Sequence, residues 1–144
     1  MSKKISDKTL RALADAAVEV KKNSYSPYSR FKVGAAVLAE DGQIYAGTNI
    51  ENASYGLTVC AERNAMFRGV CEGQRKFVAL AVCTDPVEGD AFGTPCGACR
   101  QVMTEFMDLN APILLVAVTK KGARKICKKK LKDLIPFPFL KPGE

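Results

Sequence analysis

The stretch KFVALAVC, residues 76–83, is a near-continuous apolar run of strand length, and such a run predicts a strand buried on both faces at the centre of a sheet. Residues 113–118 form a second apolar run, and residues 31–39 predict a largely buried strand. Asp41-Gly42 is a strong hairpin signal, so residues 43–48 are expected to return as the partner of residues 31–39.

Helical patterns alternate with these strands. The first helix is expected over residues 6–22, where Leu and Ala recur at helical spacing and Ser6 or Asp7 could cap its start. Further helices are expected from residue 60 to about 71 and from Cys96 or Gly97 to about Met107. A last short strand near residues 124–127 and a short helix over residues 128–135 complete an α/β sandwich around one sheet.

The size and composition fit one ordinary globular domain. The chain has 144 residues, of which 47% are hydrophobic and 26% charged, so we expect a single domain over residues 1–144. No apolar run follows the first lysines, and the longest apolar stretch, residues 113–118, is far too short to cross a bilayer. We therefore expect a cytoplasmic protein with no signal peptide and no membrane partner.

The net charge is +7, and much of the positive charge lies near the C-terminus. The basic residues there are Lys120, Lys121, Arg124, Lys125, Lys128, Lys129, Lys130 and Lys132. No aromatic residues are interleaved with them, and they match no nucleic-acid-recognition motif. We therefore favour a solvent-exposed charged face over a nucleic-acid-binding surface. No nucleic-acid partner is expected.

Six cysteines and the absence of histidine narrow the chemistry. Without histidine there is no Ser-His-Asp or Cys-His nucleophile and no imidazole metal ligand. A general acid or base must then be Glu, Asp, Lys, Tyr or Cys. Reduced cysteines at close spacing point to metal binding or redox chemistry.

Two segments, TVCAERNA (residues 58–65) and TPCGACRQV (residues 94–102), each open a helix after a loop. Cys96 and Cys99 lie three residues apart on a first helical turn and can bind one ion, although this spacing alone also suits a redox pair. Cys60 supplies a third thiolate, which leaves one position open for water, as in catalytic zinc sites. The remaining cysteines, Cys71, Cys83 and Cys127, are expected to be buried or incidental thiols.

Glu62 and an arginine complete this pattern. Beside an open three-thiolate site, Glu62 can take a proton from water and deliver it elsewhere, whereas a lone first-turn glutamate would only offset the helix dipole. Arg63 or Arg100 can hydrogen-bond a thiolate and offset the negative charge of the cluster. We favour Arg63 because it adjoins both Cys60 and Glu62.

Cys-Ala-Glu followed by Pro-Cys-x-x-Cys, together with YSPYSRFKVGAA (residues 25–36) and NIENASY (residues 49–55), resembles the small homotetrameric zinc-dependent cytidine deaminases of the cytidine/deoxycytidylate deaminase superfamily. The resemblance extends from the first helix to Phe139. It implies a three-layer α/β/α sandwich around a single mixed five-stranded sheet. It also implies a homotetramer with sites at subunit junctions, and one Zn²⁺ per subunit held by Cys60, Cys96 and Cys99.

The resemblance also implies substrate contacts. Phe31 would pack against the pyrimidine, Asn49 and Glu51 would hydrogen-bond the ribose 3′-hydroxyl, and the Ala61 backbone would contact the base. Tyr55 would lie at a subunit junction near the ribose. The segment LIPFPF, residues 134–139, has the spacing that would make Phe139 close a neighbouring subunit's site.

The implied activity is hydrolytic deamination of cytidine and deoxycytidine to uridine and deoxyuridine with release of ammonia, in pyrimidine nucleoside salvage. Zinc would lower the pKa of a water that attacks C4, and Glu62 would carry its proton to N3 and the leaving amine, with no organic cofactor. Three alternatives remain at this point: deamination of another cytosine compound such as blasticidin S, a zinc-stabilised nucleic-acid-binding module, and a redox Cys-x-x-Cys protein.

Overall fold

The apolar run at residues 76–83 is strand β3 (Phe77–Thr84), and it lies in the middle of a five-stranded sheet. The computed structural model describes residues 4–87 and 92–142. The strand order is β2-β1-β3-β4-β5, with β1 at Val33–Ala39, β2 at Ile44–Thr48, β4 at Pro112–Val118 and β5 at Arg124–Lys130. Only β3 and β4 run parallel to each other; the other neighbouring pairs are antiparallel, so the sheet is mixed.

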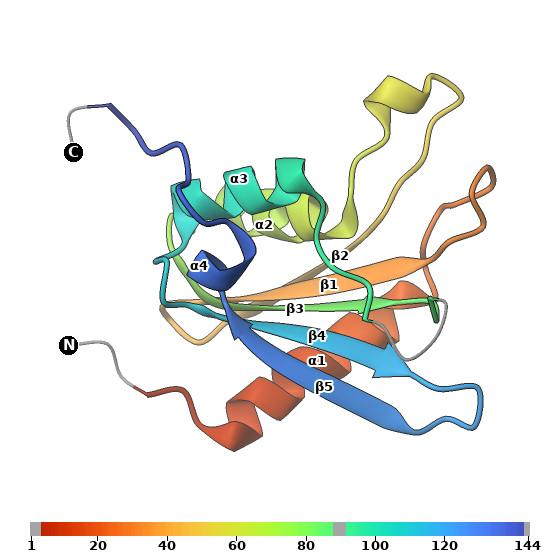
Figure 1. Cartoon of the computed structure of the whole chain (residues 1–144), viewed down its shortest axis with the longest axis horizontal. Coiled ribbons are helices and arrows are strands. Elements are labelled where there is room, and N and C mark those ends of the chain that lie inside the picture. The colour runs from red at the N-terminus through yellow and green to blue at the C-terminus, as the bar shows by residue number, and fades with distance from the viewer. Residues whose placement is uncertain (1–3, 88–91, 143–144) are drawn as a thin grey trace.

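Helices cover both faces of this sheet, which confirms the expected α/β/α sandwich (Figure 1). Helix α1 (Asp7–Lys21) lies on one face, and α2 (Ala61–Cys71) and α3 (Gly97–Phe106) lie on the other. Ser6 caps α1 by accepting a hydrogen bond from the Thr9 amide at 3.1 Å, which satisfies one of the free donors at the helix start.

Alternate side chains of the central strands fill two separate cores. Toward α2 and α3, Leu80 and Val82 pack with Met66 and Met103. Toward α1, the intervening strand residues pack against its apolar side, including Leu13. This alternation is the pleat of a strand buried on both faces, and it explains why β3 carries almost no polar residue.

The expected helix over residues 128–135 is wrong in its first three residues. Strand β5 continues to Lys130, because Lys128 pairs with Leu114 and Lys130 with Pro112 along β4. The last helix, α4 (Leu131–Leu134), begins only where Leu131 becomes buried. Main-chain pairing with β4 therefore overrides the helical preference of the lysine run.

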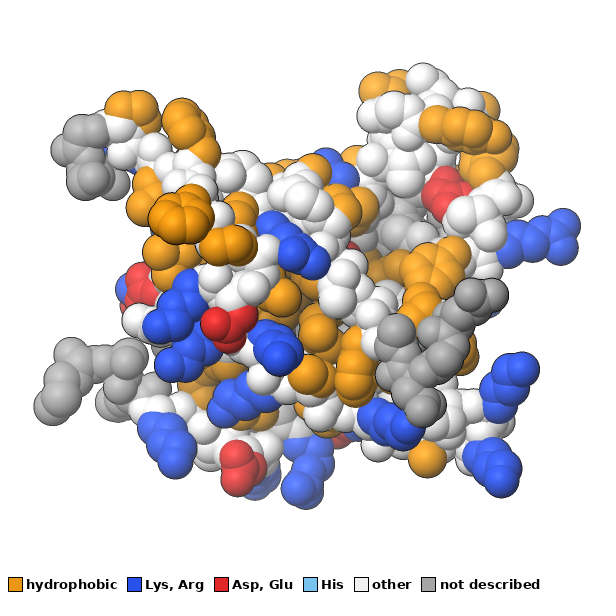
Figure 2. Space-filling model, in the orientation of Figure 1, with side chains coloured by type: hydrophobic (Ala, Val, Ile, Leu, Met, Phe, Trp, Pro, Cys, Tyr) orange, Lys and Arg blue, Asp and Glu red, His pale blue; other side chains and the backbone are white. Residues whose placement is uncertain are grey.

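The basic residues of β5 lie on the open edge of the sheet and are almost all exposed. Figure 2 shows lysine and arginine side chains over the lower half of the view, where β5 and α1 lie. Arg124 pairs with Asp15 of α1. Lysines on an edge strand oppose pairing with a further strand, so the charge has a structural role here.

Within the described ranges, no helix has the length and apolar character needed to cross a membrane. Strand β3 includes Thr84, and of the segment between β3 and α3 residues 88–91 lie outside the described residues.

Helix α1 lies directly on β1 at Gly34. A Cβ atom there would stand 2.2 Å from the carbonyl oxygen of Ala17 and 2.7 Å from the backbone nitrogen of Lys21. Because both neighbours are backbone atoms, the helix would have to move away from the sheet. Gly34→Ala should lower the free energy of unfolding by about 1–3 kcal/mol or more, measured by urea denaturation.

Gly56→Ala is the matched control for this substitution. No heavy atom of the described residues, apart from chain neighbours, lies within 4 Å of a Cβ built at Gly56. It should change the unfolding free energy by less than about 0.5 kcal/mol. Equal stability of both variants would mean that α1 does not pack on β1 this closely.

Candidate metal centre

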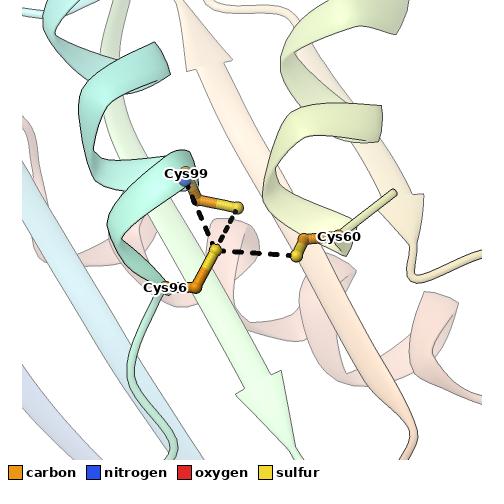
Figure 3. A group of neighbouring side chains, drawn as sticks. All are labelled: Cys60, Cys96 and Cys99. Atoms are coloured by element: carbon orange, nitrogen blue, oxygen red, sulfur yellow. Dashed lines mark hydrogen bonds between the residues drawn. The ribbon is translucent and has the colours of Figure 1, made fainter. Parts of the chain in front are cut away.

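Two helix starts bring three cysteine sulfurs together. Cys60 is the residue before α2 and Cys96 the residue before α3, and both have extended backbone there. Cys99 follows in the first turn of α3. Figure 3 shows the three side chains converging between the two helices, with Sγ–Sγ distances of 3.7 Å from Cys60 to Cys96 and 3.6 Å from Cys96 to Cys99.

These distances suit one zinc ion. All three sulfurs lie within 4.8 Å of one another. A tetrahedral ion with Zn–S bonds of about 2.3 Å places its sulfur ligands about 3.8 Å apart, close to the two distances above. The positive ends of two helix dipoles face the sulfurs and stabilise the thiolate forms that bind metal.

Within the described part of the chain, no fourth protein ligand joins them. Among residues 4–87 and 92–142, Cys60, Cys96 and Cys99 are the one group of three or more potential ligands close enough to share an ion. Cys71 is exposed at the end of α2, Cys83 is buried in β3, and Cys127 lies in β5. A three-thiolate set leaves one coordination position for water, which is typical of a catalytic zinc site rather than a structural one.

Arg63 contacts the thiol cluster. One of its guanidinium nitrogens donates to the Cys60 sulfur at 3.3 Å. The hydrogen bond from Cys99 and then that from Arg63 lower the pKa of the Cys60 thiol to about 5, against the opposing effect of burial. Arg63 thus offsets the negative charge that accumulates when several thiols ionise.

Arg100, the other arginine considered, has a different position. Its Nε atom donates to the Pro95 carbonyl at 2.7 Å, and a terminal nitrogen donates to the Leu134 carbonyl at 2.6 Å. The side chain therefore connects the loop before Cys96 to the C-terminal end of α4. This role was not predicted, since neither carbonyl is recognisable as a partner from the sequence.

Glu62 is a buried carboxyl beside the cysteines. It lies in the first turn of α2 and is only 4% exposed. Burial raises the pKa of this carboxyl to about 7. A glutamate that served only to offset a helix dipole would be expected in solvent, so its burial beside the thiols favours a role in proton transfer.

A hollow of about 570 Å³ opens next to the cysteines. It is lined by most of the residues that the sequence singled out: Phe31, Asn49, Glu51, Cys60, Ala61, Glu62 and Cys96. The structure thus brings together residues from the loop before β1, the end of β2, and the starts of α2 and α3. The volume suits a small molecule with several polar groups.

Tyr55 and Phe139 are not among the residues of this one chain that line the hollow. Tyr55 is 75% exposed, packs edge-on against Tyr28 with ring centroids 5.7 Å apart, and lines a second hollow of about 360 Å³. The two hollows share Ser29, Glu51 and Thr58. Phe139 is 73% exposed and belongs to the C-terminal segment after α4.

Asn49 and Glu51 use much of their hydrogen-bonding capacity within the protein. Asn49 Oδ1 accepts from the Val33 amide at 3.0 Å and from the Ser24 hydroxyl, and its Nδ2 donates to the Phe31 carbonyl at 2.8 Å. Glu51 accepts from residues 28 and 29. The serines of this network were missed, because these contacts depend on how the loop folds back.

Three thiols at two helix starts, an open ligand position and a buried carboxylic acid define a class of protein: a zinc-dependent hydrolase that activates water at a hollow. Residues 7–114 match the family model described as the cytidine and deoxycytidylate deaminase zinc-binding region, and the chain belongs to this family.

Curated relatives agree with that membership. The chain is 54% identical over 97 residues to a cytidine deaminase from Sporosarcina psychrophila, a match covering 67% of this chain and 69% of the relative. It is 42% identical over 130 residues to a probable cytidine deaminase from Dictyostelium discoideum, covering 90% and 83%.

A solved structure shares the fold. The crystal structure of cytidine deaminase from Burkholderia pseudomallei superimposes with a TM-score of 0.81 at 39% identity, over 94% of this chain and all of that one.

Substitution of each clustered cysteine tests the metal centre. Cys60→Ala, Cys96→Ala and Cys99→Ala should each lose most of their zinc on dialysis, because two thiolates hold the ion much less tightly than three. Metal analysis of the purified variants gives the zinc content per chain.

The other cysteines supply the controls. Cys71→Ala, Cys83→Ala and Cys127→Ala should retain one zinc per chain, since these thiols lie outside the cluster. Full zinc in the Cys60 variant would indicate a two-cysteine redox site. Loss of zinc from the Cys71 variant would indicate a closed structural site.

Proposed function

We propose that this protein catalyses the hydrolytic deamination of cytidine and deoxycytidine to uridine and deoxyuridine, with release of ammonia, in pyrimidine nucleoside salvage. The observation that carries the proposal is the buried Glu62 carboxyl at the open three-thiol site. The relatives named cytidine deaminase support the choice of substrate.

Each part of the site has a proposed share in the reaction. Cys60, Cys96 and Cys99 would hold Zn²⁺, which would supply the Lewis acidity that activates a water molecule for attack. Glu62 would take one proton from the attacking water and give it to N3 as the new C4–O bond forms. It would then move the second proton from the hydroxyl now on C4 to the amino group, so that the C4–N bond breaks, ammonia leaves and the C4 carbonyl of uridine remains. With a pKa of about 7, the Glu62 carboxyl can both accept and donate a proton near neutral pH.

The hollow supplies the proposed contacts to the substrate. Phe31 packs against the pyrimidine and the Ala61 backbone contacts the base beside Glu62, and both residues line the hollow. Glu51 is a carboxylate and can only accept a hydrogen bond, which suits the sugar 3′-hydroxyl as donor. Asn49 keeps one amide hydrogen beyond its bond to Phe31 and can donate it to the same hydroxyl.

We also propose a single domain over residues 1–144, a cytoplasmic location, and a homotetramer in which Tyr55 lies at a subunit junction and Phe139 closes a neighbouring chain's site. Exposed apolar side chains support the assembly. Figure 2 shows apolar side chains on two projections, which Figure 1, in the same orientation, identifies as the loop before α2 and the C-terminal segment. Tyr55 and Leu57 in that loop, and Phe137 and Phe139 in that segment, are exposed. Such residues are typically covered by a partner.

Glu62→Gln tests the proposed proton transfer. The variant should keep its zinc and its fold but lose ~10²–10⁴-fold or more in kcat, because Glu62 is the one buried carboxyl among the residues that the structure describes. Ammonia release from cytidine and zinc content are measured on the same preparations.

Glu105→Gln is the matched control, since Glu105 is an exposed residue of α3. It should turn over cytidine at the rate of the unmodified protein. Turnover of the Glu62 variant within tenfold of that rate would remove Glu62 from the mechanism.

A panel of substrates tests the proposed sugar contacts. Cytidine and deoxycytidine should both be deaminated, while kcat/KM for free cytosine should be lower by up to ~10⁴-fold, because polar groups built for the sugar are left unpaired. Cytidine 3′-monophosphate should be rejected, since its phosphate would meet the Glu51 carboxylate. Comparable kcat/KM for cytosine and cytidine would contradict the roles of Asn49 and Glu51.

A further inference from the structure

The Ser29 hydroxyl lies between two proposed substrate contacts. It donates a hydrogen bond to Glu51 Oε2 and accepts one from the Phe31 amide at 3.0 Å. Ser29 lines both hollows, as Glu51 does. One hydroxyl group therefore connects the residue proposed to face the sugar with the residue proposed to face the base.

Tyr28 and Ser29 also set the orientation of the Glu51 carboxylate. Oε1 accepts from the Tyr28 amide at 2.9 Å and from the Ser29 amide at 3.1 Å, so both of its lone pairs are used. Oε2 accepts only the Ser29 hydroxyl among the hydrogen bonds within the described chain, which leaves it one lone pair. The oxygen available to a ligand is thus the one that Ser29 holds.

The same hydrogen bonds keep Glu51 ionised. The Ser29 hydroxyl, and to a smaller extent the two amides, lower the pKa of this carboxyl below its ordinary value. An ionised carboxylate accepts hydrogen bonds and donates none, so it accepts from a sugar hydroxyl and repels a phosphate.

The backbone next to Ser29 has an unfavourable conformation. Arg30 has a φ of 57°, a left-handed conformation that costs free energy for any residue other than glycine. The Phe31 main chain is held on both sides, at its amide by Ser29 and at its carbonyl by Asn49 at 2.8 Å. Removal of the Ser29 hydroxyl releases one of these two attachments.

We propose that Ser29 is a positioning residue for nucleoside specificity: by holding Glu51 Oε2 and the Phe31 amide with one hydroxyl, it fixes the sugar acceptor relative to the base contact. The inference rests on the proposed function of the site. Ser29 acts through Glu51, so its effect is on discrimination between a nucleoside and its free base, and not on the proton transfers of Glu62.

Ser29→Ala and Ser29→Thr test this proposal. In Ser29→Ala the ratio of kcat/KM for cytidine to kcat/KM for cytosine should fall roughly 10- to 100-fold, the effect of losing a hydrogen bond to a charged group. The loss should appear in KM, with kcat for cytidine nearly unchanged. Ser29→Thr keeps the hydroxyl and should restore the ratio to within about threefold of the unmodified protein.

Ser54→Ala is the matched control. Ser54 lies in the exposed loop just before Tyr55, and its side chain makes no capping hydrogen bond there. It should leave the ratio unchanged. A fall in Ser54→Ala as large as that in Ser29→Ala, or no rescue by Ser29→Thr, would overturn the proposal.

A double-mutant cycle with Glu51→Ala separates the proposal from the function on which it rests. If Ser29 acts through Glu51, the double variant should show nearly the same ratio as Glu51→Ala alone. If Glu51→Ala does not lower the ratio, the sugar contact is wrong and the proposal fails with it. If Glu51→Ala lowers the ratio while Ser29→Ala does not, or if the two effects add, only the Ser29 proposal is wrong.

Discussion

The whole site depends on two helices whose first turns bring three cysteine sulfurs together. Cys60 and Cys96 lie where the extended chain turns into α2 and α3, and their sulfurs are 3.7 Å apart. This proximity requires α2 to lie close to the sheet. At Gly47 of β2 a Cβ would stand only 2.5 Å from the Ala65 backbone nitrogen, so a glycine there permits the contact.

Several thiols and carboxyls lie close together in this site, and their ionised forms repel one another. The surroundings of each group determine how readily it ionises. Arg63 and the N-terminus of α2 favour the thiolate form of Cys60, while burial raises the pKa of the Glu62 carboxyl to about 7. Glu51 remains ionised at the far wall, where solvent and three hydrogen bonds stabilise it. The pKa values of the two carboxyls are therefore shifted in opposite directions because their surroundings differ.

Sequence reasoning predicted what depends on local pattern. The period of α1, the hairpin turn at Gly42 and the apolar run of β3 each specify an element with little help from the rest of the chain. It failed where distant pairing decides: residues 128–130 extend β5 only because β4 lies beside them. The clustering of Cys60 with Cys96 was predicted from chemistry, whereas the contacts of Ser29 and Arg100 depend on loop closure.

Contacts from α3 hold the C-terminal segment in place. Arg100 binds the Leu134 carbonyl and Gln101 binds the Phe139 carbonyl at 2.8 Å, so one helical turn holds both ends of residues 134–139. Between them Phe137 has a φ of 54°, a conformation that tethered ends can maintain. Because Arg100 directly follows Cys99, the turn that supplies a zinc ligand also sets the direction in which the C-terminal aromatic residues project.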